Sequence, residues 1–214
     1  MNKDFIVRDY NLSFAALEDE PGVVEGKPVV YNSRTNLGYF DEIIETGALD
    51  EADLRDVRLC LNHDTSYVYA RSRRNSPNST MRLSVGTDGL EIRAKLDVEN
   101  SPKAQDFYSA IKRGDIDKMS FMFSVDDEEW EDLKSDHPTR HIRKIGSIVE
   151  VSAVTFPAYN TTEIFARSKA ALDSARAAME IESRQNADAL DSAKKAHDLE
   201  IAKLKTITLT GGKK

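Results

Sequence analysis

The stretch KMSFMFSV, residues 118–125, has the alternation of a β-strand with one buried face. Met119, Phe121 and Phe123 share one face at a period of two, so we expect this strand to line the core of a folded domain. Ser120 lies on the opposite face, where another apolar residue would suit a buried strand. The serine therefore needs an explanation beyond packing.

The sequence on both sides of this strand alternates β and helical signals. MRLSV (81–85) and LEIRAKL (90–96) bracket the turn GTDG, which predicts a β-hairpin. Residues 101–115 begin with Ser-Pro and have a glycine near the end, which predicts a helix. HIRKIGSIVEVSAVTF (141–156) predicts one long strand or two short ones. These segments therefore predict a domain that combines strands with a helix.

Four further segments give local expectations. VVEGKPVVYN (23–32) predicts a hairpin that turns at its glycine, and DEADLRD (50–56) predicts a short helix. VRLCLNHD (57–64) predicts a strand that runs into a polar end. Residues 126–136 hold seven acidic residues and one lysine, which is typical of a solvated loop rather than an acidic binding site.

The chain divides by composition into residues 1–160 and residues 161–214. All six prolines lie in the first part, and no aromatic residue follows Phe165. The second part is rich in Ala, Asp, Glu and Lys, so its helix propensity is high, but large apolar residues are sparse. We expect a folded domain followed by a helical tail that is exposed, forms a weak coiled coil or orders against a partner.

Composition excludes several classes of protein. The chain has 214 residues, 40% of them hydrophobic, and a formal net charge of −7, which argues against binding to nucleic acid or to an anionic membrane surface. No apolar run is long enough for a membrane span, and the first residues lack the pattern of a secretion signal. A single cysteine, Cys60, rules out an internal disulfide framework. These features predict a cytoplasmic protein.

Three predicted strands each place one polar residue among apolar neighbours: His63, Ser120 and Glu150. An ionised carboxylate in such surroundings is costly unless a donor meets it, and a histidine is such a donor. Serine, histidine and a carboxylate are the parts of an activated nucleophile. Each residue also has a plainer interpretation: an ordinary strand serine, a hydrogen-bonded surface histidine, and a glutamate paired with an arginine.

Other candidates for chemistry are weaker. Cys60 could act as a thiol nucleophile, but alternation places it on the face opposite His63, and a buried inert cysteine is the commoner case. His137 and His141 are four residues apart, which suits a metal site on a helix, but Pro138 disfavours a helix there. Neither a metal site nor another cofactor site is expected, and G-x-S-x-G and glycine-rich phosphate loops are absent.

Three segments in this order resemble the prohead (capsid maturation) serine proteases of tailed bacteriophages, which are similar in fold to the herpesvirus assemblins. They are LCLNHD (59–64), GDIDKMSFMFSV (114–125) and IVEVSAVTFPAYNTT (148–162). The resemblance extends over about residues 20–162 and leaves the tail uncovered. It implies an α+β protease domain, a mostly antiparallel β-barrel with flanking helices, followed by the helical tail.

Carried over by motif, the resemblance makes His63 the general base and Ser120 the nucleophile, facing a cleft. Glu150 is our choice for the third member, whereas an assemblin-like His-Ser-His arrangement would nominate His141. The chain departs from the family pattern in two places where the family often has glycine: YVYARS follows NHD, and Met122 stands in the MSF string. Both departures concern the shape of the cleft.

The resemblance implies a serine endopeptidase without cofactors that acts during capsid maturation. Its expected substrates are the scaffolding segment of the major capsid protein, the internal scaffold and the protease itself, whose tail self-cleavage could remove. The expected place is the assembling procapsid in the host cytoplasm, with no nucleic-acid or membrane partner and with a homo-oligomer as one expected state. The alternatives are a non-enzymatic scaffolding protein with a degenerate protease-like module and a serine hydrolase of small esters.

Overall fold

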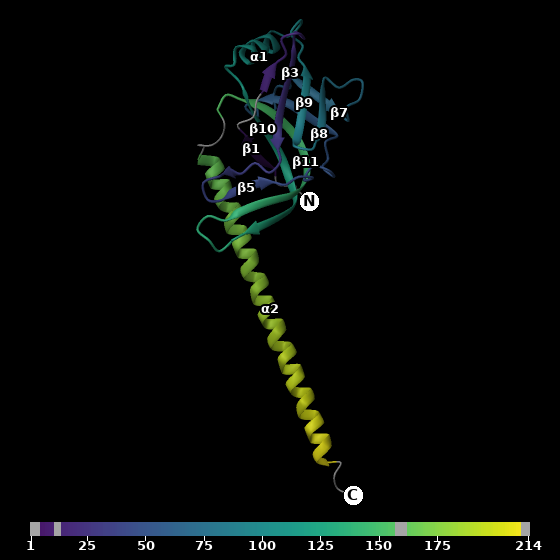
Figure 1. Cartoon of the computed structure of the whole chain (residues 1–214), viewed down its shortest axis with the longest axis vertical. Helices are drawn as coiled ribbons and strands as arrows, with labels where there is room; N and C mark the ends of the chain where they lie inside the picture. Colours follow the sequence, from purple (N-terminus) through teal and green to yellow (C-terminus); the bar gives the residue numbers. More distant parts are fainter. Residues whose placement is uncertain (1–4, 11–13, 157–161, 211–214) are drawn as a thin grey trace. The chain divides into compact units, whose positions relative to one another are not determined.

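The computed structural model of the chain describes residues 5–10, 14–156 and 162–210 (Figure 1). The chain divides into two compact units, residues 1–169 and residues 170–214. The described elements, in chain order, are β1 (Ile6–Tyr10), β2 (Phe14–Ala16), β3 (Val23–Val30), β4 (Thr35–Asn36), β5 (Asp41–Ile44), β6 (Asp56–Leu61), β7 (Ala70–Arg73), β8 (Met81–Gly86), β9 (Gly89–Lys95), α1 (Pro102–Arg113), β10 (Lys118–Glu131), β11 (Thr139–Val154) and α2 (Thr162–Thr210).

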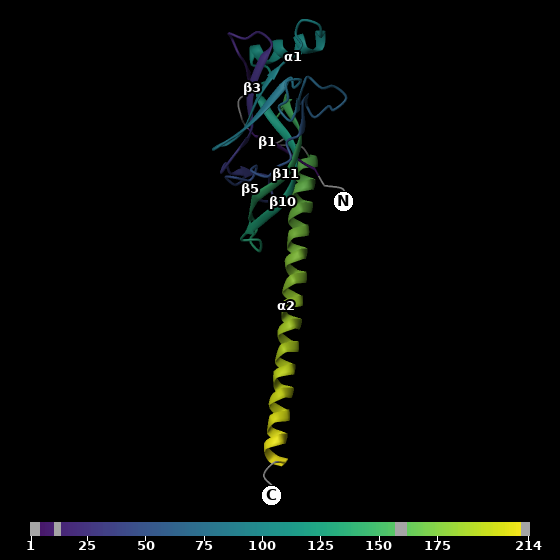
Figure 2. The same cartoon turned by 90° about the vertical axis from the view of Figure 1, so that its right-hand side faces the viewer.

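The larger sheet is built around two long antiparallel strands, β10 and β11, which run side by side in both views (Figures 1 and 2). β1 pairs with the outer edge of β10. On its other edge β11 pairs in parallel with β5 near its start and with β6 near its end. The predicted strand at 118–125 is confirmed, and residues 141–156 belong largely to one long strand.

The second sheet has four antiparallel strands in the order β2-β3-β9-β8. Its apolar residues join those of the larger sheet and of α1 in one hydrophobic cluster, so the core lies between the sheets. Phe121 and Phe123 stack in this cluster with ring centroids 4.6 Å apart, as the alternation in KMSFMFSV predicts. The opposite face of β10 is therefore the one that can carry a site.

Two local predictions are confirmed in detail. Residues 81–86 and 89–95 form the β8–β9 hairpin. Ser101 caps α1 by accepting a hydrogen bond from the Ala104 amide at 3.2 Å, and Gly114 ends the helix at φ 77°.

Two local predictions are wrong because long-range pairing overrides local signals. Gly26 does not turn the chain but lies within β3, paired with Phe14 on one side and Ile92 on the other. Residues 50–56 do not form a helix. There the Asp53 carboxylate accepts hydrogen bonds from the Arg55 amide at 3.0 Å and from its Nε at 2.7 Å. These bonds favour a local turn over helical backbone.

The acidic run at 126–136 is also mostly strand rather than loop, since β10 continues to Glu131. The reason lies opposite it in β11. Glu128 pairs there with Arg140, and Glu129 pairs with Arg143. These cross-strand pairs neutralise the acids, which a search of the acidic segment alone cannot detect.

The expected α+β class with mostly antiparallel strands is confirmed, but the expected barrel is not found. Between residues 5 and 156, where the structure describes the strands, their pairings form two sheets and close neither of them. The physical reason is that β11 divides its free edge between two strands, β5 and β6, instead of returning to β1.

Helix α2 covers most of the predicted tail. Its surface holds i,i+4 ion pairs, such as Lys195 with Asp191 at 2.7 Å, and leaves Leu190 74% exposed. None of the described helices is both long and apolar enough to cross a membrane. The division of roles between domain and tail stays a prediction.

Candidate active site

Ser120 lies on the face of the larger sheet that points away from the core. It is opposite Ser152 of β11, which is in turn opposite Cys60 of β6. Their neighbours Phe121 and Val151 point into the hydrophobic cluster on the other face. Paired residues on adjacent strands share a face, so Ser120, Ser152 and Cys60 form a row across three strands.

The turn after β6 brings His63 to this same face. Asn62 and His63 both have left-handed backbone, at φ 50° and 60°. The Asn62 amide donates to the Ala153 carbonyl at 2.9 Å, which fixes the turn against β11. Two left-handed residues break the period of two, so the expectation that His63 and Cys60 lie on opposite faces is wrong.

His63 and Glu150 form a close pair. The His63 Nδ1 lies 2.7 Å from Glu150 Oε2, and the Glu150 side chain is only 2% exposed. The other carboxylate oxygen, Oε1, accepts a hydrogen bond from the Ser152 hydroxyl. Because a carboxylate only accepts, Nδ1 carries the proton of this bond, and Nε2 is the ring nitrogen that can take a proton from a nucleophile.

Ser152 supports this pair and was not singled out from the sequence. Its Oγ also accepts a hydrogen bond from the His63 amide at 3.0 Å, so one hydroxyl holds both partners. The sequence contained the information needed to find it, because Ser152 is two residues after Glu150 in a predicted strand and must share the face of that glutamate.

Replacing Ser152 by alanine is expected to lower the free energy of unfolding by about 1.5–3 kcal/mol, because a hydrogen bond to a buried carboxylate is lost. Ser124→Ala is the matched control, since Ser124 is equally buried and its hydroxyl bonds the neutral Ser147 hydroxyl at 3.0 Å. The control should lose about 1 kcal/mol in urea unfolding. Equal losses would argue against a charged partner.

Ser120 is fully buried rather than exposed in a cleft as expected. Its hydroxyl donates to the backbone carbonyl of Arg8 in β1 at 2.9 Å. The structure thus unites two of the predicted residues, His63 and Glu150, and places Ser120 on the same face beside Ser152, with its hydroxyl turned to β1.

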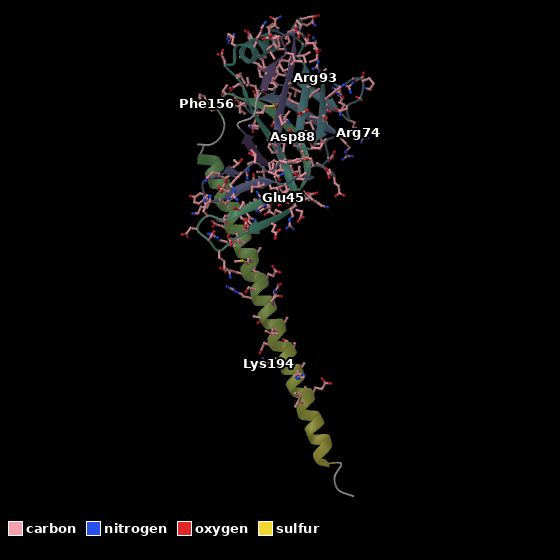
Figure 3. The ribbon with its side chains drawn as sticks, in the orientation of Figure 1. Glu45, Arg74, Asp88, Arg93, Phe156 and Lys194 are labelled. Atoms are coloured by element: carbon pink, nitrogen blue, oxygen red, sulfur yellow. The ribbon has the colours of Figure 1, made fainter. Side chains whose placement is uncertain are left out.

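His141, the alternative third member, lies elsewhere in the sheet. Its Nδ1 is 3.1 Å from Oε1 of Glu45, which is labelled in Figure 3, and its Nε2 is 3.4 Å from Glu131. His141 precedes Ser152, the partner of Ser120, by eleven residues on β11. At about 3.3 Å per residue this is roughly 36 Å along the strand. The geometry favours Glu150 over His141.

The two histidines considered as metal ligands have separate carboxylate partners. His137 Nε2 lies 2.9 Å from Asp41, whereas His141 contacts Glu45 and Glu131. Burial alone would raise the pKa of Asp41, but hydrogen bonds from His137 and Arg34 outweigh it and hold that pKa below its usual value. Among the residues that the structure describes, no group of three or more His, Cys, Asp or Glu side chains could hold a metal ion.

Cys60 is an unsuitable nucleophile. Burial, reinforced by the nearby Glu150 carboxylate, raises the pKa of its thiol to about 12. The thiol therefore stays protonated near neutral pH, and the thiolate is the reactive form.

A cleft of about 230 Å³ opens beside the His63 turn. Tyr67 and Tyr69 line it with ring centroids 4.8 Å apart, and the Lys103 ammonium lies 4.4 Å from the Tyr67 ring centroid. Both tyrosines come from YVYARS, where the resembling family often has glycine. The two tyrosines that stand in place of the family's usual sequence thus line this cleft.

Comparison with models of protein families agrees with the sequence resemblance. The model of a family described as Caudovirus prohead serine protease matches residues 10–175. Comparison with curated protein sequences finds no match. Among solved structures the capsid assembly protease gp21 of bacteriophage T4 is 13% identical, with a TM-score of 0.41 over 73% of this chain and 100% of that chain.

Proposed function

The chain belongs to the caudovirus prohead serine proteases, and from this premise we propose that Ser120, His63 and Glu150 form the catalytic triad of a serine endopeptidase. The observation that carries the assignment is the buried Glu150 carboxylate beside His63 Nδ1 at 2.7 Å. A buried carboxylate next to an imidazole fixes its tautomer and stabilises its protonated form. This arrangement suits His63 to act as a general base.

In the proposed mechanism the Ser120 hydroxyl attacks the carbonyl carbon of a peptide bond. His63 Nε2 takes the hydroxyl proton and passes it to the leaving amine, which gives an acyl-enzyme and a released amine. Water then attacks the ester with His63 again as the base, and Ser120 is regenerated. Glu150 accepts the hydrogen bond from His63 Nδ1 and stabilises the imidazolium in both steps.

The proposed substrates are the scaffolding segment of the major capsid protein, the internal scaffold and this chain itself. The reaction takes place inside the assembling procapsid in the host cytoplasm and requires no cofactor. What supports this is the match to the prohead protease family over residues 10–175. Cleavage within the segment that joins the domain to α2 would release the tail.

Co-expression with the capsid protein tests the proposal. The wild type is expected to produce new capsid-protein termini, found by mass spectrometry, and Ser120→Ala is expected to produce none. Ser124→Ala, which removes another buried hydroxyl from the same strand, should leave the cleavage unchanged. Cleavage that persists in Ser120→Ala would refute the assignment.

The second candidate is a non-enzymatic assembly protein. The specific observation in its favour is that Ser120 is fully buried and donates to the Arg8 carbonyl, so the described state is closed to substrate. For this candidate, wild-type and Ser120→Ala chains should support the assembly of uncleaved capsids equally well. The co-expression experiment therefore separates the two candidates.

A further inference from the structure

β1 pairs along the edge of β10, the strand that carries Ser120. It is an edge strand that pairs in the sheet with β10, with Asp9 opposite Ser120 and Arg8 opposite Phe121. β1 also precedes nearly all of the region matched by the family model, which begins at residue 10. Without β1, the main-chain groups of β10 around Ser120 would form an open sheet edge.

An extended peptide binds to such an edge by main-chain hydrogen bonds, as an added strand. A protease must also bring the carbonyl group of its substrate to the nucleophile. In this structure the Arg8 carbonyl already lies 2.9 Å from the Ser120 hydroxyl. β1 therefore occupies the sheet edge at which the backbone of a substrate would bind.

The hydrogen bond also makes the occupied state unreactive. The Ser120 hydroxyl donates to the carbonyl oxygen of Arg8, so its proton is directed at β1. Transfer of that proton to the general base requires the hydroxyl to turn away from Arg8. β1 is bound as a strand and is not positioned as a peptide under attack.

A buried ion pair fastens β1 to the rest of the sheet. The Arg8 guanidinium donates from Nε to Glu42 Oε1 at 2.5 Å and from Nη2 to Glu42 Oε2 at 2.9 Å. The Arg8 side chain is 4% exposed and the Glu42 side chain is fully buried. Glu42 belongs to β5, which lies beyond β11, so this bidentate pair ties β1 to the far side of the sheet.

We propose that the β10 edge is the peptide-binding site of this protein, that β1 is its intramolecular occupant, and that the Arg8–Glu42 pair is the latch that must open before a substrate binds. This inference rests on the proposed role of Ser120. The ligand it predicts is an extended peptide recognised through its main chain. Release of β1 frees at once the sheet edge and the Ser120 hydroxyl.

The test measures how fast a serine-directed fluorophosphonate labels Ser120 in two variants that act in opposite directions. Arg8→Gln weakens the latch and is expected to raise the labelling rate about tenfold or more, as the loss of charge-assisted hydrogen bonds shifts the population toward release. Val7 and Met122 are directly opposite each other, so Val7→Cys with Met122→Cys allows a disulfide lock. The oxidised lock is expected to suppress labelling, and reduction is expected to restore it.

Arg34→Gln is the control for Arg8→Gln, because Arg34 also pairs with a β5 carboxylate, Asp41, but is 56% exposed. It should label at the wild-type rate. Amide hydrogen exchange of residues 6–10 verifies that Arg8→Gln releases β1 in a folded protein. If Arg8→Gln does not fold, the reversible lock alone decides.

The outcomes distinguish the role of β1 as occupant of the β10 edge from the proposed function. Equal labelling of Ser120 in the locked, reduced and wild-type chains overturns the role of β1 and keeps Ser120 as nucleophile. If Ser120 is labelled in no form of the protein, including one whose β1 amides exchange freely, the assignment of the nucleophile and the role of β1 both fail. An adduct on another serine instead overturns the assigned site.

Discussion

Replacing Glu150 by glutamine is expected to lower the rate of capsid-protein cleavage on the order of 10⁴-fold, the scale seen when the acid of a serine-protease triad becomes an amide. The neutral amide neither fixes the His63 tautomer nor stabilises the imidazolium, while its size preserves the packing. The rate is measured on purified chain with the capsid protein that the co-expression experiment shows to be cleaved.

Glu45→Gln is the matched control for Glu150→Gln. Glu45 also lies beside a histidine, with Oε1 3.1 Å from His141 Nδ1. That histidine precedes Ser152, which is paired with Ser120, by eleven residues on β11. This variant, and His141→Ala, should retain cleavage within a few-fold of the wild type. Loss of cleavage in the Glu45 and His141 variants but not in Glu150→Gln would restore the His-Ser-His alternative.

Arg140→Met is expected to lower the free energy of unfolding by about 3–5 kcal/mol, the cost of removing one partner from a buried ion pair. Arg140 donates to the fully buried Glu42 at 3.0 Å and also pairs with Glu128. In the variant Glu42 keeps its ion pair with Arg8. Urea unfolding monitored by circular dichroism measures the loss.

The effect of Arg140→Met should depend on pH. Burial alone would raise the pKa of Glu42, but Arg8 and Arg140 outweigh it and hold that pKa below its usual value. As the pH falls, the unfolded chain therefore takes up the proton before the folded chain does. The stabilisation is fully present well above the usual pKa of the carboxyl and is lost as the pH falls through the pKa of the folded state, so the difference from wild type should narrow in acid.

Arg34→Met provides the surface comparison for this prediction. Arg34 pairs with Asp41 at 2.9 Å, but its side chain is 56% exposed. Solvent screens such a pair, so we expect a loss of about 0–1 kcal/mol. Losses of similar size in the Arg34 and Arg140 variants would contradict the role assigned to burial.

Local sequence patterns correctly predicted the elements that are determined by interactions between residues close in sequence. The β8–β9 hairpin, the capped helix α1 and the alternating strand of Phe121 follow from turn, cap and period rules. The acidic segment at 126–136 was predicted wrongly, because the same strand continues through it to Glu131. Arg140 and Arg143, which pair with its acids, come later in the chain and face them only after the sheet forms.

The candidate site divides in the same way. His63, Ser120 and Glu150 were identified from polar residues in apolar strands and from the resemblance. Ser152 was missed, although its spacing from Glu150 was visible. The acceptor of the Ser120 hydroxyl, the Arg8 carbonyl, comes from a strand more than a hundred residues away in sequence, and no sequence pattern indicates that the two lie close in space.

The amino-acid sequence by itself determined the alternating strand, the three polar residues and the family, because these depend on residue type and order. Only the tertiary structure decided which faces and edges meet. Two left-handed residues turned His63 toward Glu150, and the pairing of β1 with β10 buried Ser120 under the Arg8 carbonyl. Such contacts arise from sheet register between distant segments, and local propensity carries no information about register.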